Sequence, residues 1–304
     1  MKVLTLLVAA AVQLSPSSPP LPSNDPPSVC DNCDEWNQPQ APFKLHGRSF
    51  YVGVRGLSAV VIQTSDGLIL LDGGLPQSAP LIEANIRTLG LNVEDIKLIL
   101  NSHAHYDHAG GIARLQRDSG ATVAASASGA KALMAGRPTK DDPQFGKDGS
   151  SGTFPPVGKV RVVKDLEELR VGDITVTAHL TPGHTPGSTT WTWSSCEGGS
   201  CVNLVYADSL TAVASDGFRY LGDQTHRDVS EAFKGSIAKV AALPCDLMLS
   251  THPGASGLFD RLKARTASPS PDPLIDKEGC RAYAATARNN LETRLVTERG
   301  GAKK

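Results

Sequence analysis

The sequence predicts an α+β fold whose two halves each contribute a sheet, with the sheets packed face to face and the helices outside. The main observation is that several short β-rich runs precede a helix-like segment, and that this order occurs twice. The 304 residues are 40% hydrophobic and 20% charged, which is typical of a globular protein with a sizeable core. A formal net charge of −1 argues against a nucleic-acid partner, because phosphate binding needs surplus Lys and Arg.

The first half begins with three short β-rich runs separated by Gly and polar turns, which is the pattern of a meander. Apolar residues at helical spacing (Leu81, Ile82, Ile86 and Leu89) then predict a helix. The Gly-, Ser- and Pro-rich stretch 145–156 is expected to be a mobile loop. The strands predicted in this half are 49–54, 58–64, 67–72, 96–101 and 122–125, and the helices are 78–89, 110–117 and 128–135.

The second half again places strands before helices, and it contains no repeat strong enough to prove duplication. We expect one domain over residues 24–304. The predicted strands are 159–164, 168–171, 174–180, 189–194, 202–207 and 246–250, and the predicted helices are 228–243 and 279–299.

The N-terminus has the pattern of a secretory signal peptide, with Met1-Lys2 followed by an apolar run over 3–12 and then a Ser- and Pro-rich stretch. The alternative is a frayed apolar tail. The run is too short to cross a bilayer, which needs ~20 apolar residues. We therefore predict a leader over 1–23, an exported protein and no membrane span.

Export changes the interpretation of the six cysteines, because thiols tend to pair in an oxidising compartment. Cys196 and Cys201 flank a turn between two strand-like runs, while Cys245 precedes a strand and Cys280 opens the last helix. We predict the disulfides Cys196–Cys201 and Cys245–Cys280. Cys30 and Cys33 form a C-x-x-C, for which a local disulfide is favoured over zinc or redox chemistry because no second C-x-x-C exists.

The strongest functional signal is the segment His103-Ala104-His105-Tyr106-Asp107-His108, which directly follows a predicted strand. In extended backbone, residues two apart point to the same side, so His103 and His105 can bind one ion. Asp107 and His108 come after the chain starts to turn, and they can face a second ion nearby.

Two further histidines lie in loops shaped by Pro and Gly, His184 in Pro182-Gly183-His184-Thr185-Pro186-Gly187 and His252 before Pro253 and Gly254. His184 completes three imidazoles on the first ion and leaves a position for water, as in catalytic zinc sites. Asp107, His108 and His252 form the second set, whose donor types suit zinc better than Mg²⁺ or Ca²⁺.

Asp72 ends a strand and is predicted either to orient an imidazole from behind or to be a plain turn residue. His46, His179 and His226 have no comparable sequence context, and we expect none of them to bind metal.

The motif H-x-H-x-D-H after a strand, the later Pro-Gly-His-Thr-Pro-Gly and the terminal loop histidine resemble the metallo-β-lactamase superfamily from about Phe43 onward. Tyr206-Ala207-Asp208-Ser209-Leu210 and His252-Pro253-Gly254-Ala255-Ser256 are similar to its subclass B3. The resemblance implies a four-layer αββα sandwich with a dinuclear zinc site at the edge of the sheets. It also implies a disulfide near the C-terminus and a periplasmic location.

The same resemblance implies hydrolysis of the β-lactam amide bond of penicillins, cephalosporins and carbapenems, and so antibiotic resistance. Two Zn²⁺ ions, ~3.5–4 Å apart, would supply a zinc-bound hydroxide that attacks without a covalent intermediate. Asp107 would orient this nucleophile, and Ser209, with Thr211, would bind the substrate carboxylate. Ser209 could instead be a strand-end cap. We also expect Phe154 and the loop near Gln144 to flank the substrate, and the protein to be a monomer.

Two rival functions remain at this point. Glyoxalase II-type thioester hydrolases share the ligand set and add a bridging Asp, and Asp208 lies close to that position. The predicted export favours the β-lactamase, because glutathione thioester metabolism is intracellular. A non-enzymatic zinc-binding protein would need closed sites, whereas three ligands on each ion leave positions open.

Overall fold

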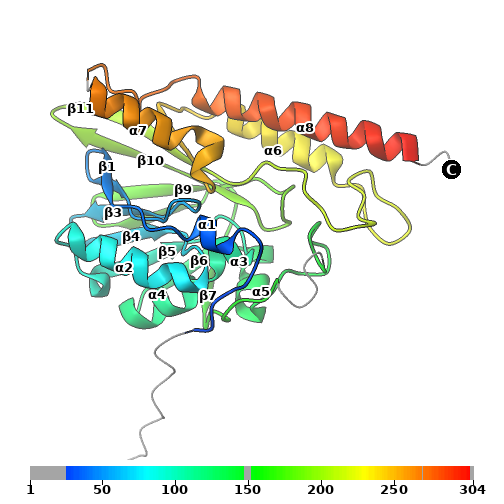
Figure 1. The fold of residues 1–304 in the computed structure, drawn as a ribbon, viewed down its shortest axis with the longest axis horizontal. Helices are drawn as coiled ribbons and strands as arrows, with labels where there is room; N and C mark the ends of the chain where they lie inside the picture. Colours follow the sequence, from blue (N-terminus) through cyan, green and yellow to red (C-terminus); the bar gives the residue numbers. More distant parts are fainter. Residues whose placement is uncertain (1–24, 147–151, 269, 302–304) are drawn as a thin grey trace, which may run out of the picture.

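The computed structural model describes residues 25–146, 152–268 and 270–301, which form four layers in the order helix, sheet, sheet, helix (Figure 1). The four-layer αββα fold expected from the sequence is confirmed. The predicted leader over 1–23, and residues 147–151 of the predicted loop, lie outside the described residues.

The first sheet has seven strands in sequence order, antiparallel from β1 to β4 and parallel from β4 to β7. Its strands are β1 (Phe43–His46), β2 (Ser49–Tyr51), β3 (Val60–Thr64), β4 (Gly67–Leu71), β5 (Ile96–Leu100), β6 (Thr122–Ser126) and β7 (Val160–Val163). Because β4 and β5 are parallel, the residues that follow them emerge at the same edge of the sheet.

The second sheet has five strands in the order β12-β11-β10-β9-β8, and only the pair β11 and β12 is parallel. Its strands are β8 (Glu168–Val171), β9 (Ile174–Leu180), β10 (Thr189–Glu197), β11 (Ser200–Ala207) and β12 (Leu247–Ser250). The parallel pair brings the loops after Ala207 and Ser250 to one edge, beside the loops that follow β4 and β5.

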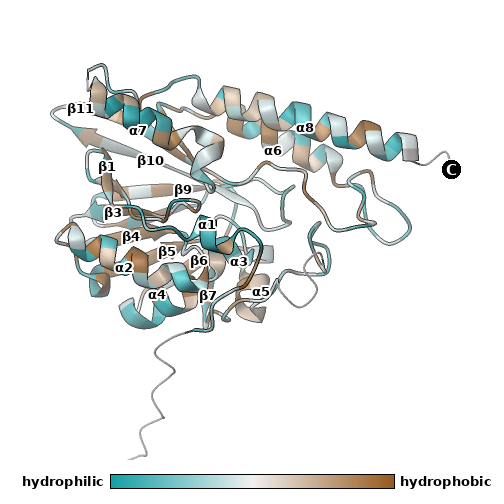
Figure 2. Cartoon of the chain, in the orientation of Figure 1, coloured by the Kyte–Doolittle hydropathy of each residue, from teal (hydrophilic) through white to brown (hydrophobic). Residues whose placement is uncertain are grey.

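Helices cover the outer faces of both sheets (Figure 1). Those over the first sheet are α2 (Ala79–Thr88), α4 (Ile112–Ser119) and α5 (Ala127–Ala135), and those over the second are α6 (Ser230–Ala242) and α8 (Gly279–Gly301). The short elements are α1 (Cys33–Trp36), α3 (Tyr106–Ala109), η1 (Pro76–Ser78), η2 (Val93–Asp95) and η3 (Pro253–Ser256). Figure 2 shows hydrophobic colours on the inner strands and hydrophilic patches on the outer helices.

The core between the sheets buries large side chains from both of them, including Tyr51, Trp191 and Tyr206. Their polar atoms are satisfied inside the core, since the Trp191 indole donates to the carbonyl of Asn101 (3.1 Å). This bond ties β10 to the end of β5, next to the histidine segment.

Among the strands and the helices of at least eight residues in the described part of the chain, β1 and the helix α7 (Leu258–Ala267) were not predicted from the sequence. β1 is a four-residue edge strand, and such a short run gives almost no periodic signal. The strand predicted over 49–54 ends early at Tyr51 because the amides of Val52 and Gly53 both donate to the carbonyl of Ala59.

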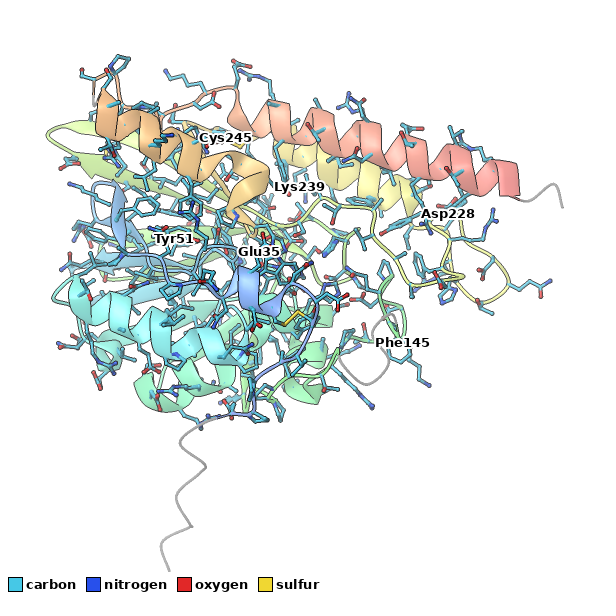
Figure 3. The ribbon with its side chains drawn as sticks, viewed as in Figure 1. Glu35, Tyr51, Phe145, Asp228, Lys239 and Cys245 are labelled. Carbon is cyan, nitrogen blue, oxygen red and sulfur yellow. A yellow bond between two sulfur atoms is a disulfide. The ribbon has the colours of Figure 1, made fainter. Side chains whose placement is uncertain are left out.

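Three disulfides are present, Cys30–Cys33, Cys196–Cys201 and Cys245–Cys280, so none of the six cysteines is free. Cys196 and Cys201 face each other across the β10–β11 hairpin, which extends farther than the sequence predicted. Figure 3 labels Cys245 close to the start of α8. Within the described part of the chain, no helix is long and apolar enough to cross a membrane.

Candidate active site

The histidine segment lies where β5 ends, and close packing around glycines fixes its turn. A Cβ on Gly110 would lie 2.4 Å from Pro76 Cδ, and one on Gly111 would lie 2.2 Å from the carbonyl oxygen of Gly73. The amide of Gly73 also donates to the carbonyl of His108 (2.9 Å). Side chains at these two positions would therefore push the short helix α3, and the ligand candidates on it, away from the sheet.

Three imidazoles predicted for one ion converge in the structure. His103, His105 and His184 are all buried, with ring centroids 4.7 to 5.0 Å apart. Their nearest nitrogen atoms lie within 4.8 Å of one another. His103 Nε2 is buried without any hydrogen-bond partner, which is costly for a polar atom unless a further group binds it. These three residues fit a metal ion.

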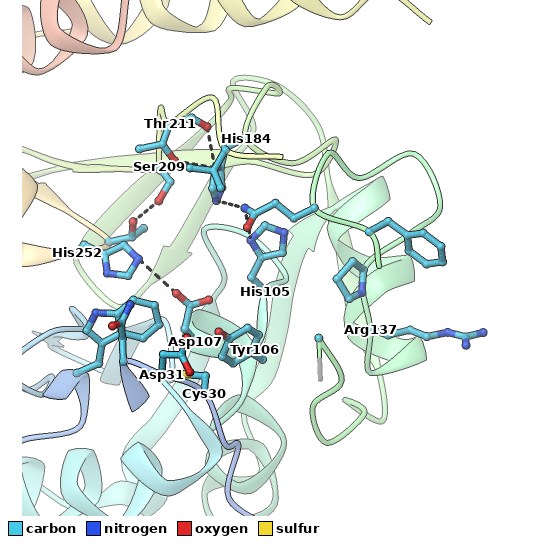
Figure 4. A pocket seen from close by; sticks show the side chains of 18 of the residues that line it. Cys30, Asp31, His105, Tyr106, Asp107, Arg137, His184, Ser209, Thr211 and His252 are labelled. Carbon is cyan, nitrogen blue, oxygen red and sulfur yellow. Dashed lines mark hydrogen bonds and ion pairs between the residues drawn. The ribbon is translucent and has the colours of Figure 1, made fainter. Parts of the chain in front are cut away.

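The second predicted set is arranged as a nearly equilateral triangle of donor atoms, and Figure 4 shows one of its sides, the contact between Asp107 and His252. His108 Nε2 lies 3.1 Å from Asp107 Oδ2 and 3.2 Å from His252 Nε2, and the third side is 3.3 Å. Ligands bound tetrahedrally to zinc at about 2.0–2.1 Å are about 3.3–3.4 Å apart, so the triangle has the size that such an ion requires.

The second set is accessible to solvent through one of its three residues. The His108 and Asp107 side chains are 0% and 10% exposed, whereas His252 is 34% exposed. His103, Asp107 and His108 also form a group whose donor atoms lie within 4.8 Å of one another. The two sets are therefore adjacent, and the second opens toward the cavity.

Oxygen atoms behind the imidazoles hold their remaining nitrogens. Asp208 Oδ1 lies 2.6 Å from His103 Nδ1, and the Asp142 carboxylate lies 3.1 Å from His105 Nε2. The backbone carbonyl of Thr211 lies 3.0 Å from His184 Nδ1. Such contacts fix the tautomer and ring orientation of a ligating histidine. The Asp142 contact was not predicted, because Asp142 lies in a loop without any motif.

Asp72 is fully buried and is not a plain turn residue. Its carboxylate accepts hydrogen bonds from the Ser102 amide (2.7 Å), the Ser102 hydroxyl (2.6 Å) and the Tyr206 hydroxyl (2.9 Å). Asp72 Oδ2 lies 4.0 Å from His108 Nδ1, which is too long for a direct hydrogen bond. Asp72 thus anchors the start of the histidine segment, with its carboxyl group behind His108.

Burial favours the neutral form of two imidazoles of the first set, His103 and His184. It lowers the pKa of His103 well below the ordinary value and lowers the pKa of His184 to about 3. Burial alone would raise the pKa of the Asp107 carboxyl, but His108 and His252 outweigh it and hold that pKa well below its usual range. Neutral imidazoles and an ionised carboxylate are the forms that bind metal.

A cavity of about 810 Å³ opens above both sets. Figure 4 shows His105, His184, Asp107 and His252 turned toward a common space, with Ser209 at its edge. The cavity is lined by residues of loops and of helix ends, including Trp36, Tyr106, Gln144, Phe145, Ser209, Thr211, Thr251 and Tyr283.

The predicted flanking residues are only partly placed as expected. Gln144 lines the cavity, and its Nε2 lies 3.3 Å from His184 Nε2. Phe154, in contrast, is 6% exposed and packs in the core under α5, so its predicted place at the substrate is wrong. Phe145 occupies the cavity rim instead, on a loop at the side of the molecule (Figure 3). The sequence could not show which of Phe145 and Phe154 lines the cavity, because this irregular loop has no apolar periodicity.

His46, His179 and His226 lie outside both sets, as expected. His179 Nε2, for example, bonds to Thr192 Oγ1 (2.9 Å) on the neighbouring strand.

Comparisons with known proteins agree with this geometry. The family model described as the metallo-beta-lactamase superfamily matches residues 52–194. The solved structure of Rm3 metallo-beta-lactamase is 47% identical, with a TM-score of 0.85, covering 89% of this chain and 99% of that one. MEM-A1, a subclass B3 metallo-beta-lactamase isolated from a soil metagenome library, is 49% identical, with a TM-score of 0.83 and coverages of 88% and 99%.

A curated relative, the hydroxyacylglutathione hydrolase of Anaeromyxobacter dehalogenans, is 30% identical over 156 residues. The match covers 51% of this chain and 46% of the relative, so this chain spans less than half of that protein's length.

An αββα sandwich with His and Asp ligand sets at the edge of its sheets defines a class of metal-dependent hydrolases. The chain belongs to the metallo-β-lactamase superfamily and, within it, to subclass B3, as the sequence resemblance predicted. The expectation of a hydrolase is thereby confirmed.

Proposed function

We propose that this protein hydrolyses the amide bond of β-lactam antibiotics, including penicillins, cephalosporins and carbapenems, with two zinc ions. The observation that carries the proposal is the pair of adjacent donor sets on the floor of one cavity. The similarity to Rm3 metallo-beta-lactamase over 99% of its length supports the same activity.

His103, His105 and His184 would hold the first zinc ion, and Asp107, His108 and His252 the second. The partnerless His103 Nε2 and the triangle of second-set donors support this assignment. When bound, zinc supplies a water nucleophile at neutral pH and polarises the carbonyl that is attacked.

The chain's own residues position the reactants. The Asp107 carboxylate, ionised and at the cavity floor, can accept a hydrogen bond from water and so orient it toward the amide carbon. Ser209 would donate a hydrogen bond to the substrate carboxylate, since its hydroxyl lies at the cavity wall. Thr211 Oγ1 lies 3.0 Å from His184 Nδ1, so its hydroxyl would act on the substrate mainly through that histidine.

Hydrolysis would proceed without a covalent intermediate on the protein. The hydroxyl of Ser209 is paired with the hydroxyl of Thr251 (2.7 Å), which is not a base that could activate it as a nucleophile. Serine-directed inhibitors should therefore fail.

Glyoxalase II-like thioester hydrolysis is the second candidate function, and the hydroxyacylglutathione hydrolase relative favours it. In that chemistry Asp208 would bridge the metals. Asp208 is fully buried, and its Oδ1 contacts His103 Nδ1, on the opposite side of the ring from Nε2. This position supports an orienting role for Asp208 and hence the β-lactamase. The open cavity also disfavours a purely storage role.

We further propose that residues 24–304 are one domain, released from a leader over 1–23 and exported to the periplasm as a monomer. Three disulfides support an oxidising compartment.

The test is turnover of a penicillin, a chromogenic cephalosporin and a carbapenem by the zinc-loaded protein, with a glutathione thioester in parallel. We expect β-lactam hydrolysis, its loss in EDTA and its return with added zinc. His103→Ala should abolish turnover, and His179→Ala, on the strand β9, should retain it. Thioester cleavage without β-lactam hydrolysis would replace the first function with the second.

A further inference from the structure

We propose that Tyr283, on the C-terminal helix, is a positioning residue for the substrate contact of Ser209. This inference rests on the proposed function. The Tyr283 hydroxyl donates to the carbonyl of Asp208 (3.1 Å) and accepts from the amide of Leu210 (3.1 Å). It therefore spans the residues on either side of Ser209.

The backbone needs this support because the sheet ends there. Ala207 pairs with Ser250 as the last residue pair between β11 and β12. Beyond that pair the ladder between β11 and β12 stops, and buried backbone polar groups must be satisfied in another way. The Asp208 amide donates to the hydroxyl of Thr190 on β10 (3.2 Å), while the Asp208 carbonyl and the Leu210 amide bond to Tyr283. One phenol hydroxyl from α8 thus satisfies two of these groups.

The Ser209 side chain is held from another direction. It is 4% exposed, and its hydroxyl lies 2.7 Å from that of Thr251, at the end of the neighbouring strand β12. Tyr283 thus fixes the backbone of the turn while Thr251 fixes the hydroxyl. Together they define where Ser209 meets the cavity.

A disulfide and buried neighbours hold Tyr283 in place. The Cys245–Cys280 disulfide ties the first turn of α8 to Cys245, two residues before β12, and Ala284 is fully buried in the core close to the disulfide. Burial also raises the pKa of the Tyr283 phenol, so it stays a neutral hydroxyl that can donate and accept at once.

The role predicts a particular kinetic signature for Tyr283→Phe. The Ser209 turn would lose two hydrogen bonds while the metal ligands keep theirs, so binding of the substrate carboxylate should weaken equally in ground and transition states. We expect KM to rise about three- to tenfold, the equivalent of one net hydrogen bond. The kcat value and the zinc content should stay at the wild-type level, because uniform binding changes KM alone.

Tyr220→Phe is the matched control. Its hydroxyl donates to the carbonyl of Val213 (3.0 Å), in the same loop but beyond the Ser209 turn. We expect this variant to keep the wild-type KM. Amide hydrogen exchange at Leu210 gives a readout that needs no turnover, and it should accelerate in Tyr283→Phe but not in Tyr220→Phe.

The outcomes separate the two proposals. If hydrogen exchange at Leu210 is unchanged in Tyr283→Phe, Tyr283 does not hold the backbone around Ser209. If exchange is faster but KM is unchanged, Tyr283 holds this backbone but has no role in substrate binding. A fall in kcat together with zinc loss would also overturn that role, because the effect would then pass through Asp208 and His103. If the wild-type protein hydrolyses no β-lactam, the proposed function and the substrate role of Ser209 fail. Hydrogen exchange at Leu210 still decides whether Tyr283 holds the backbone around Ser209.

Discussion

Four of the five imidazoles in the two donor sets have an oxygen from outside these sets within hydrogen-bond distance of one ring nitrogen, and His108 is the exception, because its Nδ1 has no such partner. For His252 this oxygen is the carbonyl of Gly56, 3.2 Å from Nδ1. Trp36 stacks obliquely on the same ring, with centroids 5.2 Å apart, although the ring is partly exposed. The most accessible ligand candidate is thus held by the N-terminal segment rather than by the sheet.

His108→Ala should reduce bound zinc from two ions to one per chain. The substitution removes one corner of the donor triangle and leaves Asp107 and His252 as an incomplete set. Metal analysis after dialysis against limiting zinc measures the stoichiometry, and His179→Ala, a half-buried histidine outside both sets, should still bind two ions. Two zinc ions retained by His108→Ala would contradict the ligand assignment.

The sequence predicted donor residues that the structure brings together, but it did not predict the groups behind them. The donor residues cluster in a six-residue motif and in Pro- and Gly-rich loops, so short segments of the sequence are enough to identify them as metal-ligand candidates. The partners of His103 and His105 lie 105 and 37 residues away, and neither Asp208 nor Asp142 belongs to a motif that specifies such a contact. Only the folded chain shows which carboxylate lies behind which ring.

At the scale of secondary-structure elements, the segments that carry the two donor sets and Ser209 all begin where a strand ends. The sequence predicted most strands and helices to within a few residues, because their apolar periodicity is strong. It missed α7, whose apolar side faces the end of the sheets through Leu258 and Phe259, just after a Pro-Gly turn. The cavity walls were predicted least well, because loop conformation depends on tertiary contacts.

The loop that carries His184 is fitted against α6, and the fit tolerates no added side chain. A Cβ on Gly183 would lie 2.2 Å from Cδ2 of Phe233, whose ring is fully buried. We expect Gly183→Ala to destabilise the protein by about 1–3 kcal/mol, as overpacked core substitutions do. It should also lower zinc occupancy, because His184 is the next residue.

Gly235→Ala is the matched control on the same helix. Gly235 lies on the exposed face of α6, and a Cβ there would meet nothing within 4 Å. This variant should gain about 0.5–1 kcal/mol, because Gly in a helix interior costs that much relative to Ala. Urea unfolding measures whether each substitution raises or lowers the free energy of unfolding. A Gly183→Ala protein with wild-type stability and full zinc content would show that the loop adapts to the added methyl group.

At the scale of the whole molecule, neither half can form the centre alone. The first sheet supplies His103, His105, Asp107 and His108, while the second supplies His184 and His252. Ser58 joins the halves at this edge, because its amide donates to the carbonyl of Thr251 (2.8 Å) and its hydroxyl to that of Ser250 (2.7 Å). The stability of the interface between the sheets therefore sets the geometry of the centre.

The Cys245–Cys280 disulfide should contribute more to this stability than the Cys196–Cys201 disulfide. The two bridges close loops with sequence separations of 35 and 5 residues. Chain-entropy arithmetic assigns about 4 kcal/mol to the longer loop and about 2 kcal/mol to the shorter one, as upper estimates. The longer bridge also connects α8, which carries Tyr283, to the segment just before β12.

Paired Cys→Ala variants of each bridge, unfolded in urea with zinc present, measure the difference. We expect the Cys245→Ala/Cys280→Ala protein to unfold at the lower urea concentration. Its KM should rise, because Tyr283 would no longer be fixed by the disulfide and would hold the backbone around Ser209 less well. The Cys196→Ala/Cys201→Ala protein should keep its KM, because that hairpin turn lies at the far end of β10 and β11 from the cavity. Equal destabilisation by both pairs would show that unfolded-chain entropy does not govern these bridges, and an unchanged KM in the first pair would show that α8 holds Tyr283 in place through packing alone.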